Sequence, residues 1–353
     1  MTQSPRPATA PPVRAAIIGC GLIAGLFLEK EKITASPITT HGAALSALPA
    51  FTLDAISDID TERLQRFQNL FAVPHAFDRW EKLIAERRPE LVVIATPDAT
   101  HADLTEKLVR TAYAPRLIIL EKPLCATPAE RLRLARLLIE TPPVQVVVNH
   151  SGRFNARYLQ IRDLIADNRL GPVVSVRWVY YGGWVHNGVH VIDNLRLFLG
   201  GSLTIRDVRP GWRDRAGDPC LELSLASDRF PHARIEIESF PESAYQLFEA
   251  EIRLEQGRIR LADFGQEITV DEVRTNAAGE RELKVSTPLI TTGSTPMLEL
   301  YRLVADHFAT ASGLLLETAG ANTVQSTMEL IHDAQIHLAG HPWGPTTPHE
   351  TVD

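Results

Sequence analysis

The first 150 residues alternate short, mainly apolar runs with longer stretches in which apolar side chains recur at helical spacing. The apolar runs lie near residues 15–18, 51–57, 91–95, 117–120 and 144–148. The helical stretches lie near residues 40–48, 61–71, 78–87, 101–111 and 128–139. Buried apolar strands that alternate with amphipathic helices are typical of a parallel sheet. The pattern therefore predicts an α/β domain built from βαβ units.

The pattern changes near residue 173, where apolar and polar positions begin to alternate as in half-buried strands. Strands are expected near residues 173–181, 203–209, 219–226, 232–239, 246–255, 258–262 and 267–274, and helices near 156–167, 190–199, 296–311 and 320–338. Runs of strands flanked by helices indicate a second, α+β domain. One broad face of its sheet needs covering, and self-association is the usual way to cover it.

Length and charge narrow the class of protein. The 353 residues have room for two domains, and a net charge of −7 argues against general nucleic-acid binding, which requires a basic face. Apolar runs stay shorter than the ~18 residues of a membrane-spanning helix. Three cysteines occur, and their spacing matches no disulfide framework or metal motif. We therefore expect a cytoplasmic protein with reduced thiols that binds neither nucleic acid nor membranes.

A glycine-rich loop follows the first apolar run. Its sequence, Gly19-Cys20-Gly21-Leu22-Ile23-Ala24, is G-x-G-x-x-A. In this motif the first glycine permits a tight turn, and the second lets the backbone approach a pyrophosphate. The small third residue packs helix on strand, and the helix N-terminus offers N–H groups to the phosphates. The motif predicts a dinucleotide site over Gly19, Gly21, Leu22, Ile23 and Ala24. The alternative is a glycine-rich turn between packed elements.

Asp58 follows the second predicted strand, where an acidic residue of a dinucleotide site is expected. Its carboxylate would accept hydrogen bonds from ribose hydroxyls and repel a 2′-phosphate, which favours NAD over NADP. Arg63 would tolerate a 2′-phosphate, so NADP is not excluded. The alternative for Asp58 is a helix cap. Its separation from Gly21 exceeds the usual spacing of about 20 residues, and we assign the excess, Phe27 to Thr39, to an inserted loop near the cofactor.

Three further strand ends carry polar or special residues, and ligands of open α/β sheets bind at these ends. Thr96-Pro97 follows the third strand, with His101 at the start of the next helix. Glu121-Lys122-Pro123 follows the fourth strand, and Asn149-His150 follows the fifth. A lysine between a buried strand and a proline is placed to hydrogen-bond a substrate hydroxyl and stabilise oxyanion character. His101 is equally explained by helix capping.

Together these motifs resemble the Gfo/Idh/MocA family of oxidoreductases, named for glucose–fructose oxidoreductase and inositol dehydrogenase. The likeness continues through Arg153-Phe154 and Gly188 to Asp193, and it covers roughly residues 13–340. It implies a Rossmann domain over residues 13–124 and an α+β domain with an open, largely antiparallel sheet over residues 125–340. Residues 1–12 are expected to form a disordered tail, and residues 341–353 a second tail. The resemblance also implies a homodimer or homotetramer.

The resemblance assigns cofactor-binding roles to Thr96, Pro97, His101, Glu121 and Lys122, in addition to Asp58 and the glycine loop. Around the catalytic histidine the family usually reads D-x-G-x-H, whereas this chain reads His186-Asn187-Gly188-Val189-His190. His190 matches the family's general acid/base, whose imidazole suits proton transfer near neutral pH. His186 stands at the aspartate position, where it is expected to bind substrate, relay a proton or mark altered chemistry.

The remaining substrate-site candidates surround this motif. Asn187 offers hydrogen bonds to a polyol, as does Asn149, and Asp193 is a partner for His190 or for its own helix. Tyr180 and Trp184 would stack on a sugar, although core packing explains Tyr180 equally well. His186, His190 and Asp193 follow at i, i+4 and i+7, a spacing that could approach zinc. The H-E-x-x-H signature is absent, and no metal is expected.

The sequence thus predicts an NAD-dependent oxidoreductase that moves a hydride between nicotinamide and a polyol, sugar or sugar derivative. His190 and Lys122 are the expected catalytic residues, with His186 as a third candidate. One alternative is a glycosidase or lyase that uses bound NAD in an internal redox cycle, which would not accumulate NADH. Another is a non-catalytic dinucleotide or sugar-binding regulator, for which Lys122 and His190 would not be needed.

Overall fold

The computed structural model describes residues 11–29, 38–140, 144–214, 217–289 and 294–338. The chain forms two compact units. The first joins Met1–Leu159 to Thr291–Met328, and the second joins Gln160–Ile290 to Glu329–Asp353. The sequence-based boundary at residue 124 stays a prediction. The expected tails fall almost entirely outside the described residues.

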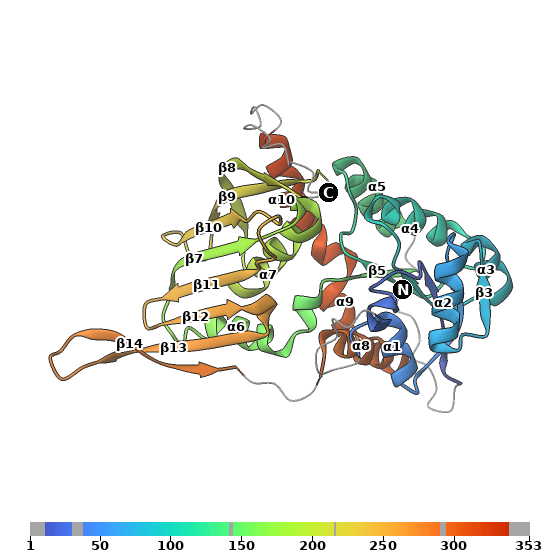
Figure 1. The fold of residues 1–353 in the computed structure, drawn as a ribbon, viewed down its shortest axis with the longest axis horizontal. Coiled ribbons are helices and arrows are strands. Elements are labelled where there is room, and N and C mark those ends of the chain that lie inside the picture. Colours follow the sequence, from blue (N-terminus) through green and yellow to red (C-terminus); the bar gives the residue numbers. More distant parts are fainter. Residues whose placement is uncertain (1–10, 30–37, 141–143, 215–216, 290–293, 339–353) are drawn as a thin grey trace. The chain divides into compact units, whose positions relative to one another are not determined.

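The first unit contains a six-stranded sheet whose strand order is β3-β2-β1-β4-β5-β6. Figure 1 labels its strands β3 and β5. All its pairs are parallel, which confirms the parallel sheet expected from the apolar runs. The strands are β1 (Val13–Ile18), β2 (Phe51–Ser57), β3 (His75–Phe77), β4 (Leu91–Ile94), β5 (Leu117–Glu121) and β6 (Gln145–Asn149). The three-residue strand β3 was not expected, because its residues are only half-buried and too few to show a period.

Helices flank this sheet at nearly the expected positions. They are α1 (His41–Ala47), α2 (Thr61–Phe71), α3 (Trp80–Arg87), α4 (His101–Arg110), α5 (Pro128–Glu140), α8 (Pro296–Thr310), α9 (Leu314–Ala319) and the first part of α10 (Ala321–Leu338). Helices α8 and α9 belong to this unit although the segment Gln160–Ile290 of the second unit precedes them. Tyr301 of α8 accordingly packs edge-on against Phe51 of β2.

The expected helix directly after the glycine loop is wrong. Wide turns follow β1 instead, in which the N–H of Leu26 donates to the carbonyl of Gly21. A short 3-10 helix, Leu26–Glu29, comes next. The N–H of His41 then donates to the carbonyl of Ile23 at 3.2 Å, so α1 continues from the turn after an interruption. Two glycines in the run weaken it as a helix. Residues 30–37 of the expected insertion lie outside the described part.

The second unit contains an eight-stranded sheet whose strand order is β14-β13-β12-β11-β7-β10-β9-β8. The β7–β10 pair is parallel and the other pairs are antiparallel, which confirms the open, largely antiparallel sheet. The strands are β7 (Val173–Tyr180), β8 (Leu203–Arg213), β9 (Pro219–Ser227), β10 (Arg234–Ser239), β11 (Glu249–Leu254), β12 (Gly257–Ala262), β13 (Glu267–Thr275) and β14 (Arg281–Pro288). Strand β14 was missed because Arg281, Glu282 and Lys284 interrupt the apolar pattern in its first half.

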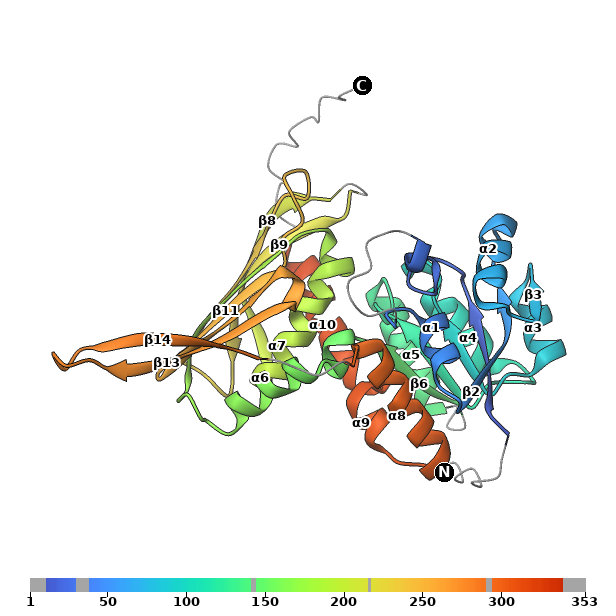
Figure 2. The ribbon, with the colours of Figure 1, turned by 60° about the horizontal axis from the view of Figure 1, so that its bottom comes forward.

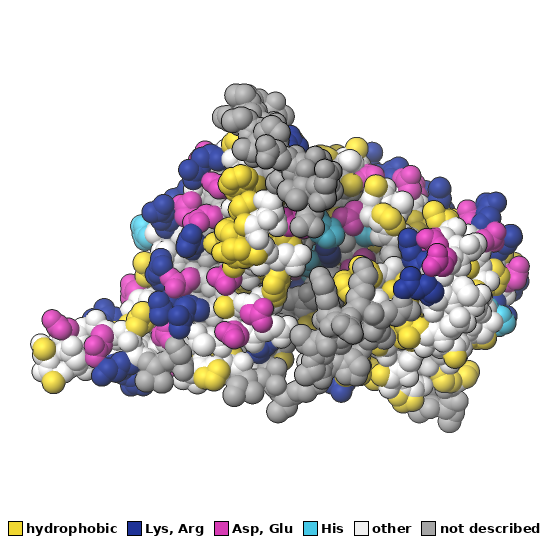
Figure 3. Space-filling view, in the orientation of Figure 1, with side chains coloured by type: hydrophobic (Ala, Val, Ile, Leu, Met, Phe, Trp, Pro, Cys, Tyr) yellow, Lys and Arg dark blue, Asp and Glu magenta, His cyan; other side chains and the backbone are white. Residues whose placement is uncertain are grey.

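One face of this sheet is covered by α6 (Ala156–Ala166), α7 (Val189–Leu199) and the last part of α10 (Figure 2). Trp178 of β7 stacks on Phe198 of α7 in the core between them. The other face carries interspersed basic and acidic side chains (Figure 3), among them the ion pairs of Arg177 with Glu238 and of Arg258 with Asp271. Charged side chains therefore make up part of the surface of this face.

Two chemical properties of the described residues bear on function. None of their helices combines the length and the apolar character needed to cross a bilayer. All three cysteines are buried and free, with no disulfide among them.

Candidate active site

The two glycines of the first loop meet different surroundings. Gly19 has a φ of +93°, and a Cβ built on it would lie 2.5 Å from the carbonyl oxygen of Ala95. Only glycine fits that position. A Cβ on Gly21 would meet no atom within 4 Å. The fold thus demands the first glycine but leaves open space at the second, as the approach of a pyrophosphate requires.

Asp58 ties the glycine loop to the end of β2. Its Oδ2 accepts a hydrogen bond from the N–H of Cys20 at 2.7 Å, and its Oδ1 accepts one from the N–H of Asp60 at 2.9 Å. The guanidinium of Arg63 lies 3.6 Å from Oδ2. A carboxylate has lone pairs left for further donors after these bonds. Asp58 therefore positions the loop and can also meet a ribose.

His101 clamps together the loops after β4 and β5. Its Nδ1 lies 2.7 Å from the carbonyl oxygen of Pro123, and its Nε2 lies 2.9 Å from the carbonyl oxygen of Thr96. The ring is fully buried. His101 therefore holds the Thr96-Pro97 segment against Glu121-Lys122-Pro123, rather than capping a helix.

Glu121 and Asn149 lie side by side at the ends of β5 and β6, where the parallel register pairs them. Asn149 Nδ2 donates to Glu121 Oε1 at 2.6 Å, and His41 Nε2 lies 2.7 Å from the same oxygen. His41 Nδ1 in turn lies 2.8 Å from Tyr301 Oη. Sequence reasoning missed His41 and Tyr301, because their positions show nothing but helical spacing along the chain.

Lys122, next to Glu121, is half-buried. Burial lowers the pKa of its amine, and the charges of Glu121 and Asp98 oppose that change. A cation held between desolvation and two carboxylates suits the stabilisation of a partly negative oxygen. The glycine loop, Asp58, Thr96, His101 and Lys122 thus all belong to the carboxyl ends of the strands of one sheet.

The histidine motif lies in the second unit. His186 is exposed and belongs to a π-helical turn, Gly183–Gly188, whereas His190 is half-buried in the first turn of α7. The expected i, i+4 arrangement of His186 and His190 on one continuous α-helix is therefore wrong. The wider π-helical turn changes the angle about the helix axis between the two side chains. Asn187 Nδ2 donates to the carbonyl of Tyr181 at 2.9 Å, and Asp193 is buried.

A carboxylate that sequence reasoning missed lies beside His186. The backbone N–H groups of Val185 and His186 donate to Asp218, and Asp214 lies close enough that a Cβ on Gly183 would meet both carboxylates. Burial, reinforced by the charge of Asp214, raises the pKa of Asp218 to about 6. The pair is separated from the motif by about 30 residues, so no local pattern pointed to it.

The structure corrects the stacking roles of Tyr180 and Trp184. Both rings are completely buried. Tyr180 Oη accepts from the N–H of Leu221 at 2.6 Å and donates to its carbonyl at 3.0 Å, while Trp184 Nε1 donates to the carbonyl of Ile331 at 2.9 Å. Because both rings are buried and their polar atoms are hydrogen-bonded within the core, neither ring is available to stack on a sugar.

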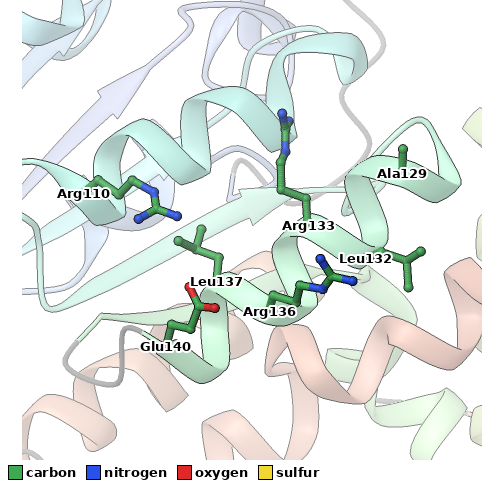
Figure 4. Close-up of a pocket in the computed structure, with 7 residues that line it drawn as sticks. All are labelled: Arg110, Ala129, Leu132, Arg133, Arg136, Leu137 and Glu140. Atoms are coloured by element: carbon green, nitrogen blue, oxygen red, sulfur yellow. The ribbon is translucent and has the colours of Figure 1, made fainter.

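A pocket of about 390 Å³ lies elsewhere, between α4 and α5 (Figure 4). Arg110, Arg133 and Arg136 line it, and Arg110 and Arg133 already pair with Glu106. It contains none of the expected site residues. Among the described residues, no group of three His, Cys, Asp or Glu side chains has a metal-binding arrangement.

Residues 13–150 match the sequence profile of an oxidoreductase family with an NAD-binding Rossmann fold, Gfo/Idh/MocA. This domain belongs to the Gfo/Idh/MocA family. Scyllo-inositol 2-dehydrogenase (NADP(+)) IolW of Bacillus subtilis is 27% identical over 205 residues, or 53% of this chain and 52% of that protein. Inositol 2-dehydrogenase of Rhizobium meliloti is 36% identical over 87 residues, or 25% of each chain. The chain thus matches about half or less of the length of these Gfo/Idh/MocA relatives.

The fold likeness extends further than the sequence likeness. KijD10, a 3-ketoreductase from Actinomadura kijaniata crystallised with NADP, superposes with a TM-score of 0.72 at 17% identity. The match covers 92% of this chain and 97% of KijD10. The chain therefore has the fold of that reductase over both units, as the Gfo/Idh/MocA resemblance predicted.

Proposed function

We propose that the protein is an NAD-dependent dehydrogenase that oxidises a CH–OH group of a polyol, sugar or sugar derivative, or reduces the corresponding ketone. The observation that carries the proposal is Lys122, a half-buried amine at the end of β5 in an NAD-binding Rossmann domain. A desolvated ammonium there would stabilise negative charge on a substrate oxygen. The named activities of the inositol dehydrogenase relatives support the substrate class.

The residues present fit a nicotinamide dinucleotide. The open space at Gly21 admits its pyrophosphate, and Asp58 has remaining lone pairs for ribose hydroxyls. When bound, NAD supplies the hydride acceptor or donor of the reaction. Lys122 Nζ donates a hydrogen bond to the substrate oxygen, and the imidazole of His190 takes its proton during oxidation and returns it during reduction. We expect Asn187 and His186 to contribute hydrogen bonds to the substrate, and Asp218 to hold the turn that carries them.

We further propose NAD as the preferred cofactor, because Asp58 would repel a 2′-phosphate. Arg63, at 3.6 Å from Asp58, is the residue that would favour NADP instead. Titration of the protein with NAD and NADP, followed by fluorescence, decides between them. Tighter binding of NADP would contradict this preference.

The activity is tested with Lys122→Ala and His190→Ala on a panel of polyols and sugars, with NADH formation as the readout. We expect each variant to lose at least about a hundredfold in kcat, because each removes a group that acts in the transition state. Lys82→Ala and His337→Ala are matched controls, since both residues are exposed on helices. Undiminished turnover in both site variants would remove the proposed function.

NAD that co-purifies without net NADH formation, on a substrate that is nonetheless consumed, would instead support the internal redox cycle. Binding without any turnover would support a regulator. We also propose that the protein is cytoplasmic, which agrees with its three free, buried cysteines.

A further inference from the structure

A series of buried hydrogen bonds leads to Glu121, the residue before Lys122. The proposed mechanism does not use these bonds. The series runs from Tyr301 of α8 through His41 of α1 to Glu121 of β5. His41 and Tyr301 are completely buried, and Glu121 is 7% exposed. Asn149 of β6 donates to the same carboxylate. Helices α1 and α8 and strand β6, which are far apart in the sequence, thus all contribute to the hydrogen bonding around the Glu121 carboxylate, next to Lys122.

We propose that His41, supported by Tyr301, is a positioning residue that holds Glu121 as an oriented carboxylate and thereby keeps Lys122 cationic during the reaction. The importance of this role for catalysis rests on the proposed function. The effect on the lysine itself does not, because it is a property of the folded chain. His41 acts through Glu121 and does not touch substrate.

The hydrogen bonds run in one direction, with Tyr301 donating to His41 and His41 donating to Glu121. Burial raises the pKa of the Tyr301 hydroxyl well above 10, so the hydroxyl keeps its proton and donates to His41 Nδ1. His41 then carries its ring proton on Nε2, which donates to Glu121 Oε1. The carboxylate accepts this bond together with that of Asn149. The tautomer of His41 is therefore selected by Tyr301.

The electrostatic consequence follows from the groups that surround the pair. Burial by itself would raise the pKa of Glu121, but the hydrogen bonds from His41 and Asn149 and the charge of Lys122 lower it. For Lys122 burial lowers the pKa, and Glu121 and Asp98 oppose that decrease. An ionised Glu121 is thus one of the two anions that keep a desolvated amine protonated.

The sign of the expected pH effect can be worked out from these contacts. Without His41, burial favours the neutral form of Glu121, and Lys122 loses a neighbouring negative charge. The pKa of Lys122 then falls further, and its cation is lost at lower pH. The alkaline limb of the kcat/KM profile therefore moves toward acid.

The experiment compares His41→Phe, His41→Gln and Tyr301→Phe with the parent protein. His41→Phe keeps an aromatic ring but removes both hydrogen bonds, whereas the amide of His41→Gln can still donate to Glu121. We expect the alkaline limb to move farthest in His41→Phe, with kcat/KM at least about tenfold lower at high pH. Tyr301→Phe should move it less, and His41→Gln should restore much of the parent profile.

The second readout is independent of turnover. The sequence has only six lysines, so a protein labelled with ¹³C and ¹⁵N in lysine gives few side-chain signals, and Lys122→Arg identifies that of Lys122. We expect the Lys122 signal to titrate at lower pH in His41→Phe than in the parent. A shift without any dehydrogenase activity would sustain the positioning role and remove only the proposed function.

The matched control is His307→Gln. His307 is also buried in the first unit, with Nδ1 2.7 Å from the carbonyl of Ser312 and Nε2 2.6 Å from Gln145 Oε1. It lies at the other end of β6 from Asn149, so its replacement should leave the Lys122 titration unchanged. Should His41→Phe fail to fold, Tyr301→Phe still tests the proposal. An unchanged Lys122 titration in folded His41→Phe, or in Tyr301→Phe where His41→Phe does not fold, would overturn it.

Discussion

Gly19 and Gly21 stand two residues apart, yet the fold constrains them in different ways. The positive φ of Gly19 and its contact with the Ala95 carbonyl exclude any side chain. The backbone at Gly21 faces open space on the side where a Cβ would point. A requirement for glycine at position 21 would therefore come from a ligand and not from the fold. Comparing substitutions at Gly19 and Gly21 tests the proposed cofactor site.

We expect Gly21→Ala to leave the free energy of unfolding within about 0.5 kcal/mol of the parent but to weaken NAD binding at least about tenfold. Gly19→Ala should lower the free energy of unfolding by about 2 kcal/mol or more, because of backbone strain and the carbonyl contact. Urea denaturation and cofactor titration measure the two effects. Parent-like NAD affinity in Gly21→Ala would place the pyrophosphate elsewhere.

Individual residues also show where sequence reasoning reached its limit. The pattern located Asp58 and Glu121 at strand ends and His101 at the start of a helix, and the structure places them there. Their contacts with Cys20, Pro123 and Asn149 could not be read from the sequence, because each crosses more than 20 positions. For Tyr180 the alternation along the strand was compatible with either sugar stacking or core packing. Its complete burial shows that it packs in the core.

At the scale of elements, the turn between β7 and α7 is held by residues from the β8–β9 hairpin. Asp218 at this hairpin accepts hydrogen bonds from the backbone of Val185 and His186. Its neighbour Asp214 accepts from the N–H of Asp218 at 2.8 Å. The π-helical turn that carries His186 is therefore tied to a carboxylate pair whose charge depends on pH.

This carboxylate predicts a specific pH dependence of stability. The folded-state pKa of Asp218, about 6, lies above the ordinary value of an aspartate, about 3.9. The folded protein then binds more protons than the unfolded chain between these values, so stability falls as pH rises from about 4 to 6. Asp218→Asn removes the titrating group and should flatten the dependence of Tm on pH in that window.

Asp207→Asn, at an exposed ion pair with Arg209 on β8, is the control and should keep the parent profile. Tm is measured between pH 4 and pH 7 for the parent and both variants. A parent-like slope in Asp218→Asn would mean that Asp218 titrates in the folded state as it does in the unfolded chain.

Elements with a strong local period were predictable, and the others were not. Strand β2 and helix α2 have the expected bounds, because a long apolar or amphipathic run leaves one compatible structure. The helix expected after Gly21 is interrupted, and the charged strand β14 exists only through its pairing with β13. Tertiary contacts outweigh weak local preference at such places.

At the scale of the whole molecule, the chain returns to its first unit after completing the sheet of the second. The segment Thr291–Met328 brings Tyr301 to the interior behind Glu121. The site's surroundings therefore draw on three distant parts of the sequence. No window around Glu121-Lys122-Pro123 contains the groups that surround it.

We expect the protein to be a homodimer or homotetramer, as the family resemblance implies. An assembly through the outer face of the second sheet would include polar contacts, because that face carries ion pairs such as those of Arg177 with Glu238 and Arg258 with Asp271. Light scattering after size-exclusion chromatography measures the mass, and its dependence on salt tests the polar contribution. A mass near that of one 39.1 kDa chain at micromolar concentration would contradict the prediction.

By itself the sequence determined the alternation of strands and helices, the two fold classes, the glycine loop and the strand-end residues that include Lys122. These depend on local periodicity and on the rule that parallel strands present their ends together. Only the tertiary structure decided that Tyr180 and Trp184 are core residues, that Asp218 stands beside His186, and that His41 and Tyr301 support Glu121. Those contacts arise when segments far apart in the chain pack together, and the pattern along the chain carries no record of them.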